Sequence, residues 1–412
     1  MKEMHGISSS DWGCFRAVKS RVSIVRGVDV EKRTREAVNL VGGIEKVVGR
    51  GDRVLIKPNM VGGFPPETGE TTDPELVKVI VEMAYEAGAK EVLVGEGEPY
   101  VSIEDLKRRF VNRSISLTEP LHSRYEKALK KVGGKLIDFN VDGWEIVEVP
   151  NPVFFDKVRV ARVLLNCDVF IGAPTLKTHH LAGITVALKN LYGAIPISDK
   201  RKYHQLDRIE EVIVDINKVR ASDIVIVDGS HTILHWGRID EYLETRRLDL
   251  TLAGFDPVAV DAVSARILGI DPKSLRFLAW AEEHGLGTAD LSRIETLGIP
   301  LEEAYKGKMM TSVDYINRKL SRIHLLNCGA CTGCFGRIAT ALFRVDDSRM
   351  RKDAYICMGP QVKPIREKGR VFLCGYCAAP TFYNRLEGTF ISGCPPDPNS
   401  LLRELEKMGA KL

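Results

Sequence analysis

The sequence lacks the features that mark a membrane or nucleic-acid-binding protein. None of its apolar stretches approaches the roughly 18 consecutive residues needed to cross a bilayer. The polar segment Met1–Ser20 contains no apolar run of the kind found in secretory leaders. The net charge is only +4, and the 28% of charged residues mix both signs, so no basic stripe is present. We therefore expect a cytoplasmic protein that binds neither membranes nor nucleic acids.

Two phosphate-binding motifs are also missing. Neither G-x-G-x-x-G nor G-x-x-x-x-G-K-[ST] occurs, so a dinucleotide or nucleoside triphosphate site is not indicated. Cysteine is scarce in most of the chain, where only Cys14 and Cys167 occur, whereas the other seven of the nine cysteines lie between Cys328 and Cys394. In a reducing compartment such a cluster favours metal or redox chemistry over a disulfide framework.

Strand and helix patterns alternate from Arg21 onward. Short apolar runs predict strands, and Asp-Pro pairs at residues 73–74, 256–257 and 271–272 predict helix starts, with the aspartate as N-cap and proline at the first helical position. This alternation predicts an α/β body with a parallel, Rossmann-like sheet. We expect an N-terminal extension (1–20), the main body (21–320) with a probable insertion at 101–150, and a C-terminal α/β domain (321–412).

Ligands of open α/β sheets bind at the carboxyl ends of the strands. The polar residues that follow the expected strands there could bind a small anionic substrate and supply a general acid or base. We predict catalytic roles for Lys177, His179 and His180. We predict substrate binding by Lys57, Asn59, Glu96, Lys189 and Asn190. Asp256 is interpreted as a helix cap, and Asp261, inside a helix, as a structural contact.

Five sequence blocks in the body occur in the order of a known family. They are Leu55–Asn59, Thr72–Pro74, Gly172–His179, Ala187–Gly193 and Ala253–Asp261. Together they resemble the domain of unknown function 362 family over roughly residues 22–300. The family is often fused to iron–sulfur modules, so the resemblance implies an α/β body beside a cluster domain.

In the C-terminal domain each cysteine group follows an expected strand. Strands ending near residues 326, 356, 373 and 391 precede Cys328, Cys357, Cys374 and Cys394. A parallel sheet would bring these groups to one edge, where helix N-termini favour thiolates. Zinc would need four ligands, for which the pairs Cys331/Cys334 and Cys374/Cys377 are candidates. An iron–sulfur cluster commonly uses a short-spaced set plus a remote cysteine before proline, as in Cys394-Pro395.

The motifs Cys331-Thr-Gly-Cys334, Gly375-Tyr-Cys377 and Gly393-Cys394-Pro395 resemble the proximal-cluster domain of nickel–iron hydrogenase small subunits. That resemblance implies a flavodoxin-like sheet and one [4Fe-4S] cluster held by Cys331, Cys334, Cys377 and Cys394. It leaves Cys328, Cys357 and Cys374 as a second site for a cluster or zinc, or as buried thiols.

These observations predict a cytoplasmic iron–sulfur oxidoreductase that couples a [4Fe-4S] cluster to a small anionic substrate. One alternative is a dehydratase or isomerase in which an open iron of the cluster acts as a Lewis acid. The other is a non-enzymatic electron-transfer or assembly partner that docks on another protein. The oligomeric state does not follow from the sequence.

Overall fold

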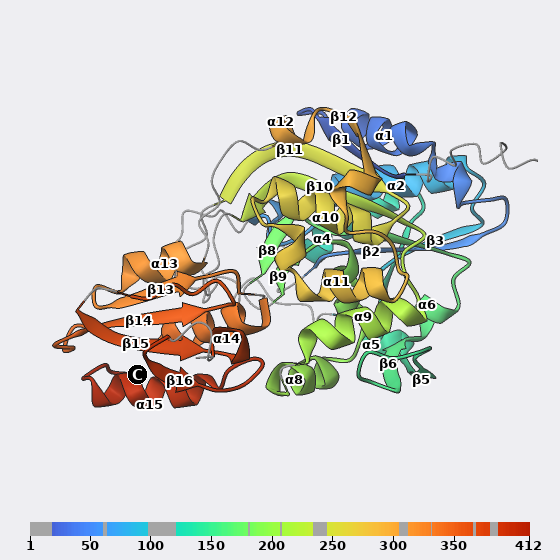
Figure 1. Ribbon diagram of the computed structural model, residues 1–412. Helices are drawn as coiled ribbons and strands as arrows, with labels where there is room; N and C mark the ends of the chain where they lie inside the picture. Colours follow the sequence, from blue (N-terminus) through green and yellow to red (C-terminus); the bar gives the residue numbers. More distant parts are fainter. Residues whose placement is uncertain are drawn as a thin grey trace, which may run out of the picture.

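The structure is a computed structural model that describes residues 19–60, 64–97, 121–179, 182–206, 208–233, 245–304, 312–330, 332–365, 368–379 and 386–412. Figure 1 shows a large body, coloured blue through yellow to light orange, and a smaller C-terminal unit in deeper orange and red. Most of the expected N-terminal extension, residues 1–18, lies outside the described residues.

The body is built on an eight-stranded sheet. In spatial order its strands are β12 (Ile294–Gly298), β1 (Ser20–Arg26), β11 (Thr245–Gly254), β10 (Ile224–Ile233), β7 (Val169–Ala173), β2 (Arg53–Pro58), β3 (Glu91–Glu96) and β4 (Lys135–Asp138). All run in one direction except β11, which is antiparallel to both β1 and β10. The expectation of a parallel sheet is therefore correct apart from this strand. Only residues 234–244 connect β10 to β11, fewer than the dozen or more that a parallel crossover needs.

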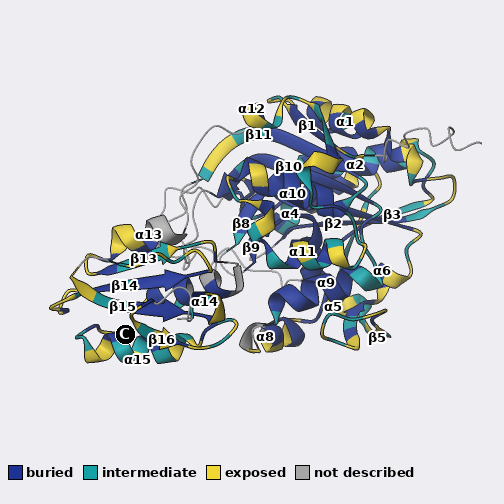
Figure 2. Cartoon of the chain, viewed as in Figure 1, coloured by how far each residue is buried: buried dark blue, intermediate teal, exposed yellow. Residues whose placement is uncertain are grey.

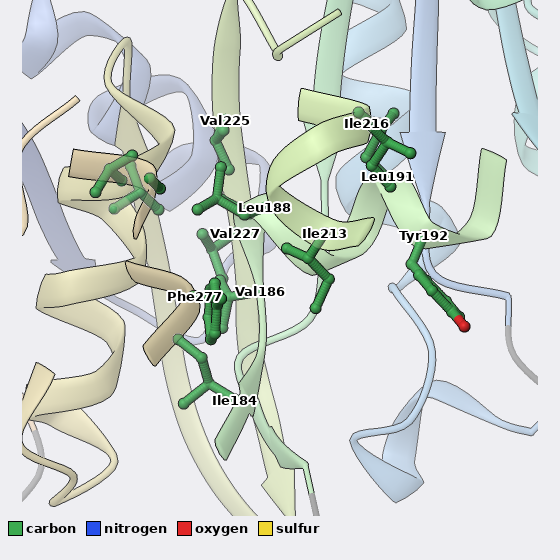
Figure 3. Close-up of a cluster of buried hydrophobic side chains, with 14 of the residues drawn as sticks. Ile184, Val186, Leu188, Leu191, Tyr192, Ile213, Ile216, Val225, Val227 and Phe277 are labelled. Carbon is green, nitrogen blue, oxygen red and sulfur yellow. The ribbon is translucent and has the colours of Figure 1, made fainter. Parts of the chain in front are cut away.

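Helices cover both faces of this sheet. One apolar layer contains α1 (Val30–Val41), α2 (Pro74–Glu86) and α4 (Leu121–Lys130). The other contains α7 (Ala187–Asn190), α9 (Ile209–Val219), α10 (Pro257–Ile267) and α11 (Arg276–Glu283). Figure 2 shows the sheet strands buried between these layers. Side chains of the second layer, including Leu188, Ile213 and Phe277, meet Val225 and Val227 of β10 in Figure 3.

Aspartate N-caps start the helices where the sequence predicts them. Asp73 accepts a hydrogen bond from the backbone N–H of Glu75 at 2.9 Å, and Asp256 accepts one from Ala259 at 2.9 Å. The caps of α2 and α10 are thus confirmed, with proline at the first helical position. Asp271 caps only the short 3₁₀ turn η5 (Pro272–Ser274), and α11 begins separately after Leu275.

The segment expected to be an insertion is partly built into the body. Residues 98–120 lie outside the described residues, but α4 packs in the first helical layer and β4 is the edge strand beside β3. The insertion expectation therefore needs correction for these two elements. Between these elements and β7, α5 (Phe139–Asp142) precedes β5 (Trp144–Glu148), which pairs with β6 (Lys157–Ala161) outside the main sheet.

The remaining elements of the body are short. They are η1 (Ile44–Lys46), η3 (Pro66–Thr68), α6 (Arg162–Leu165), β8 (Lys177–His179), β9 (Gly183–Thr185), η4 (Leu191–Ala194), α8 (Ile197–Gln205), η6 (Leu291–Arg293) and α12 (Leu301–Ala304). Strands β8 and β9 form an antiparallel hairpin directly after β7.

The C-terminal unit has its own parallel sheet. Its strands β13 (Ile323–Asn327), β14 (Asp353–Met358), β15 (Gly369–Cys374) and β16 (Thr389–Ile391) lie side by side in chain order. The helices are α13 (Ser312–Lys319), α14 (Thr332–Leu342) and α15 (Pro398–Lys407), with the turn η7 (Tyr376–Ala378). The α/β character matches the expectation, but a flavodoxin-like sheet reverses its strand order and this one does not. Ile270 packs against both this unit's core and the body's core.

Among the described residues, no helix is long and apolar enough to span a membrane.

Candidate functional site

The strand order of the body contains a reversal point between β2 and β7. From β2 the chain proceeds outward through β3 to β4 on one side, whereas β7 leads to β10 on the other. Ligands of open α/β sheets bind in the crevice at the carboxyl ends of the two strands that flank such a reversal. Lys57 and Asn59 lie at that end of β2, and Thr175 and Lys177 follow β7.

A buried ion pair stands at this point. Lys57 Nζ lies 2.7 Å from Glu96 Oε2, and both side chains are at most 3% exposed. Lys57 Nζ also donates to Asn190 Oδ1 at 3.0 Å and to the carbonyl of Pro58 at 3.2 Å. Three acceptors therefore surround an ammonium that has three N–H donors.

The two asparagines extend this network. Asn59 Nδ2 donates to Asn190 Oδ1 at 2.8 Å, and Asn190 Nδ2 donates to the Lys57 carbonyl at 2.7 Å. Asn59 Oδ1 in turn accepts from the Thr175 amide at 2.9 Å and its hydroxyl at 3.1 Å. The structure thus brings together four residues predicted to bind substrate, but their polar groups satisfy one another.

Gly193 lies directly beside the Lys57–Glu96 ion pair. A Cβ at this position would lie 2.3 Å from Glu96 Oε1 and 2.4 Å from Lys57 Nζ, so a side chain here would have to displace the buried ion pair. Lys189 Nζ lies 5.2 Å from the ring centroid of Tyr192. The hydrogen bonds therefore fix Lys57, Glu96 and Asn190 relative to one another at the carboxyl end of the sheet.

Asp261 holds the helix that supplies Asn190. Its two carboxylate oxygens accept the backbone N–H groups of Ala187 and Leu188 at 2.6 and 3.0 Å. Complete burial raises the pKa of Asp261 to about 7, against the opposing effect of these two hydrogen bonds. The interpretation of Asp261 as a structural contact is confirmed, and the contact positions α7.

Two of the three residues predicted to be catalytic, Lys177 and His179, lie on β8, which follows Thr175 of the network. Lys177 Nζ donates to the Glu70 carbonyl at 2.7 Å and to its carboxylate at 2.8 Å. His179 Nδ1 accepts the backbone N–H of Ala182 at 3.1 Å, which places the proton of a neutral ring on Nε2. His180 lies outside the described residues.

Three of the four predicted cluster ligands come from loops that meet at the carboxyl edge of the C-terminal sheet. Cys334 lies in the first turn of α14, Cys377 in η7 after β15, and Cys394 in the loop after β16. A Cβ on Gly375 would lie 3.0 Å from Cys334 Sγ. The amide of Tyr376 donates to the Gly393 carbonyl at 3.0 Å, which ties the Cys377 turn to the Cys394 loop.

The fourth predicted ligand, Cys331, lies outside the described residues, between Ala330 and Thr332. Cys334 is buried, whereas Cys377 and Cys394 are exposed. In the described part of the chain, no three His, Cys, Asp or Glu side chains are grouped closely enough to hold a single metal ion.

The other three cysteines do not share one side of the sheet. Cys357 pairs with Leu373 in the strand register, and Met358 pairs with Cys374. Because neighbouring residues of a strand point to opposite faces, Cys357 and Cys374 face opposite ways, and they belong to different apolar clusters. Burial raises the pKa of each thiol to about 12, so both stay protonated at neutral pH. Cys328 is half-buried, and burial likewise raises its pKa.

Sequence reasoning missed three residues of these sites. Glu70 follows no expected strand, so nothing marked it as the partner of Lys177. Thr185 lies opposite Lys177 in the hairpin, a pairing that depends on the turn between them. Gly193 lies in the Ala187–Gly193 block, but its closeness to Lys57 could not be predicted, because the two residues are more than 100 positions apart in the chain.

Sequence comparison finds one matching family and a curated relative. The model of the domain of unknown function (DUF362) matches residues 54–266, just over half of the chain. A thylakoid-associated protein of Synechocystis sp. is 28% identical over 279 residues, which is 65% of this chain and 80% of the relative.

Structure comparison gives weaker likenesses. The lactate racemase apoprotein from Thermoanaerobacterium thermosaccharolyticum aligns with 83% of this chain and 69% of its own, at 11% identity and a TM-score of 0.33. A structural-genomics target from Thermotoga maritima aligns with 63% of this chain and 60% of its own, at 14% identity and a TM-score of 0.34. At such TM-scores neither likeness defines a shared fold.

Proposed function

This chain belongs to the domain of unknown function (DUF362) family, and on that scaffold we propose an iron–sulfur oxidoreductase. A [4Fe-4S] cluster is held by Cys331, Cys334, Cys377 and Cys394 in the C-terminal unit. A small anionic substrate binds beside the Lys57–Glu96 network in the body. A redox partner protein exchanges electrons with the cluster.

The observation that carries this proposal is the meeting of three cysteine-bearing loops. Gly375 leaves room for Cys334 Sγ at the turn that carries Cys377, and a backbone hydrogen bond joins that turn to the Cys394 loop. Thiolates are the usual ligands of such clusters, so this donor set fits the group. When bound, the cluster supplies one-electron transfer.

A single zinc ion fits this arrangement less well. Zinc needs four donors around one atom, and the described cysteines, histidines and carboxylates form no such group of three. An iron–sulfur cluster commonly includes a remote cysteine before proline, as in Cys394-Pro395, and this pattern favours the cluster.

The Lewis-acid alternative would place Cys328, Cys357 and Cys374 around one cluster. We favour the oxidoreductase because Cys357 and Cys374 face opposite sides of the sheet. In the body, His179 offers a ring with a defined tautomer for proton transfer, and Lys177 offers positive charge. These groups favour an enzyme over a purely electron-carrying partner.

Anaerobic reconstitution followed by iron and sulfide analysis, visible absorption and EPR tests the cluster. We expect about four irons and four sulfides per chain, the composition of the proposed cluster, in the wild type and marked iron loss in Cys334→Ser, Cys377→Ser and Cys394→Ser. Cys167→Ser is the matched control, since Cys167 lies in the body and its thiol donates to the Leu164 carbonyl. A colourless protein that retains zinc after these steps would contradict the proposal.

A further inference from the structure

We propose that Lys177 and Thr185 form a carboxylate-binding subsite on the β8–β9 hairpin, which assigns small carboxylic acids as the substrate class. The inference rests on the proposed function, because it identifies where that function's anionic substrate binds. Lys177 donates one hydrogen bond to the carboxylate, and Thr185 donates the other.

The strand register places these two side chains together. Lys177 on β8 is paired directly with Thr185 on β9, and residues directly opposite in an antiparallel pair point to the same face. Ile184 and Val186, on either side of Thr185, point into the core cluster in Figure 3. Thr185 therefore points to the opposite face, together with Lys177.

Thr185 has an unused hydrogen-bonding group at this position. Its side chain is only 5% exposed, yet its hydroxyl has no hydrogen-bond partner among the described residues. Leaving a buried hydroxyl unpaired is unfavourable, because the group loses its hydrogen bonds to water. A ligand oxygen at this point would remove that cost.

The Lys177 ammonium also has one N–H group that no described residue accepts. Its ammonium carries three N–H groups, and two described acceptors, both on Glu70, contact it. A carboxylate already binds this ammonium at 2.8 Å, so the position suits that chemical group. One remaining lysine donor and one threonine hydroxyl match the two oxygens of a carboxylate. A phosphate dianion would need more donors.

The subsite adjoins a residue with the proton chemistry for a carboxylic acid substrate. His179 is two residues from Lys177 on β8, so it shares that face of the hairpin and lies opposite Gly183. The ring's Nε2 can exchange a proton with the substrate's reacting carbon or oxygen. Glu70 competes with the substrate for Lys177 and lowers its affinity.

Isothermal titration of the purified full chain with malonate, and separately with inorganic phosphate at the same ionic strength, tests the subsite. We expect malonate to bind and phosphate to bind at least about tenfold more weakly. Thr185→Val should weaken malonate binding by about tenfold or more, because a hydrogen bond to a charged group contributes about 1.5–3 kcal/mol. Thr185→Ser keeps the hydroxyl and should retain binding. Glu70→Gln should tighten binding, since the competing charge is gone.

Lys177→Met alone would leave the Glu70 carboxylate without its partner and destabilise the hairpin. The double variant Glu70→Gln/Lys177→Met avoids this problem. It removes both charges, and circular dichroism checks its fold; it should not bind malonate. Equal affinity for phosphate, unchanged binding by Thr185→Val, or binding by the folded double variant would overturn the subsite. Malonate binding needs no cluster, so this result and the iron content of Cys334→Ser can fail independently of each other.

Discussion

Gly193 packs directly against the ammonium group of Lys57. A Cβ on Gly193 would lie 2.4 Å from Lys57 Nζ and 2.3 Å from Glu96 Oε1, closer than atoms can approach. The segment after α7 therefore packs against a buried ion pair, at the point where ligands of open α/β sheets usually bind.

Gly193→Ala should lower the free energy of unfolding by about 3 kcal/mol, because the methyl group overpacks the site and separates a buried ion pair. Urea unfolding measures the change. Gly49→Ala is the matched control: neither glycine has a positive φ, and a Cβ on Gly49 would meet Asp52 Oδ2 at an ordinary 3.6 Å. Equal stability of the two variants would show that the network tolerates displacement.

A double-mutant cycle on Lys57 and Glu96 should reveal strong coupling. Lys57→Met leaves a carboxylate buried without its cation, and Glu96→Gln leaves the cation without its carboxylate. Each should cost about 3–5 kcal/mol. The double variant removes both charges, so its loss should fall short of the sum by at least about 1 kcal/mol. Additive losses in urea unfolding would mean that the pair does not act as a unit.

The sequence predicted the elements of this site better than their relationships. Lys57, Asn59 and Glu96 were identified because strand ends converge in an α/β sheet, and Asn190 because it lies in the Ala187–Gly193 block; the four do meet. The sequence did not predict that the hydrogen-bonding groups of these residues would satisfy one another. This depends on the α7–η4 segment, which places Asn190 between the others. Likewise, the Asp-Pro caps could be predicted because they are local sequence signals. The antiparallel direction of β11 is not local: only the short connection between β10 and β11 indicates it.

The cysteines show the same limit. The register of β14 and β15 decides that Cys357 and Cys374 face opposite ways, and a shift of one residue would have put them on one face. Sequence spacing cannot specify that register. The Cys334, Cys377 and Cys394 loops, by contrast, follow from the strand ends alone.

Asp261 should make stability fall as pH rises. Its pKa is about 7 in the folded protein and 3.8 in the unfolded chain, so the folded state binds more protons between these values. The contribution is fully present below about pH 4 and lost as pH rises through 7. Each pKa unit corresponds to about 1.4 kcal/mol. Asp261→Asn should reduce this slope, which urea unfolding between pH 4 and 8 would measure. The slope that remains belongs to Asp73, because burial raises its pKa to about 6.

Asp290 should affect the pH dependence of stability in the opposite direction and serves as a comparison. The Ser292 hydroxyl lowers the pKa of Asp290, so its contribution is present above the unfolded pKa and is lost as pH falls. Asp290→Asn should therefore leave the slope between pH 4 and 7 intact. If Asp261→Asn shows the wild-type slope, another buried group must carry the protons.

Gly375→Ala should impair the proposed cluster site without removing a thiol. The residue has a φ of +90°, which alanine adopts at a cost of about 1–3 kcal/mol, and its Cβ would press on Cys334 Sγ at 3.0 Å. Gly269→Ala separates the two effects, since Gly269 has a φ of +73° but open space around it. After identical anaerobic reconstitution, we expect reduced iron content and a weaker EPR signal in Gly375→Ala alone. If Gly269→Ala loses as much iron, the loss reflects general backbone strain, and the closeness of Gly375 to Cys334 would have no bearing on the cluster.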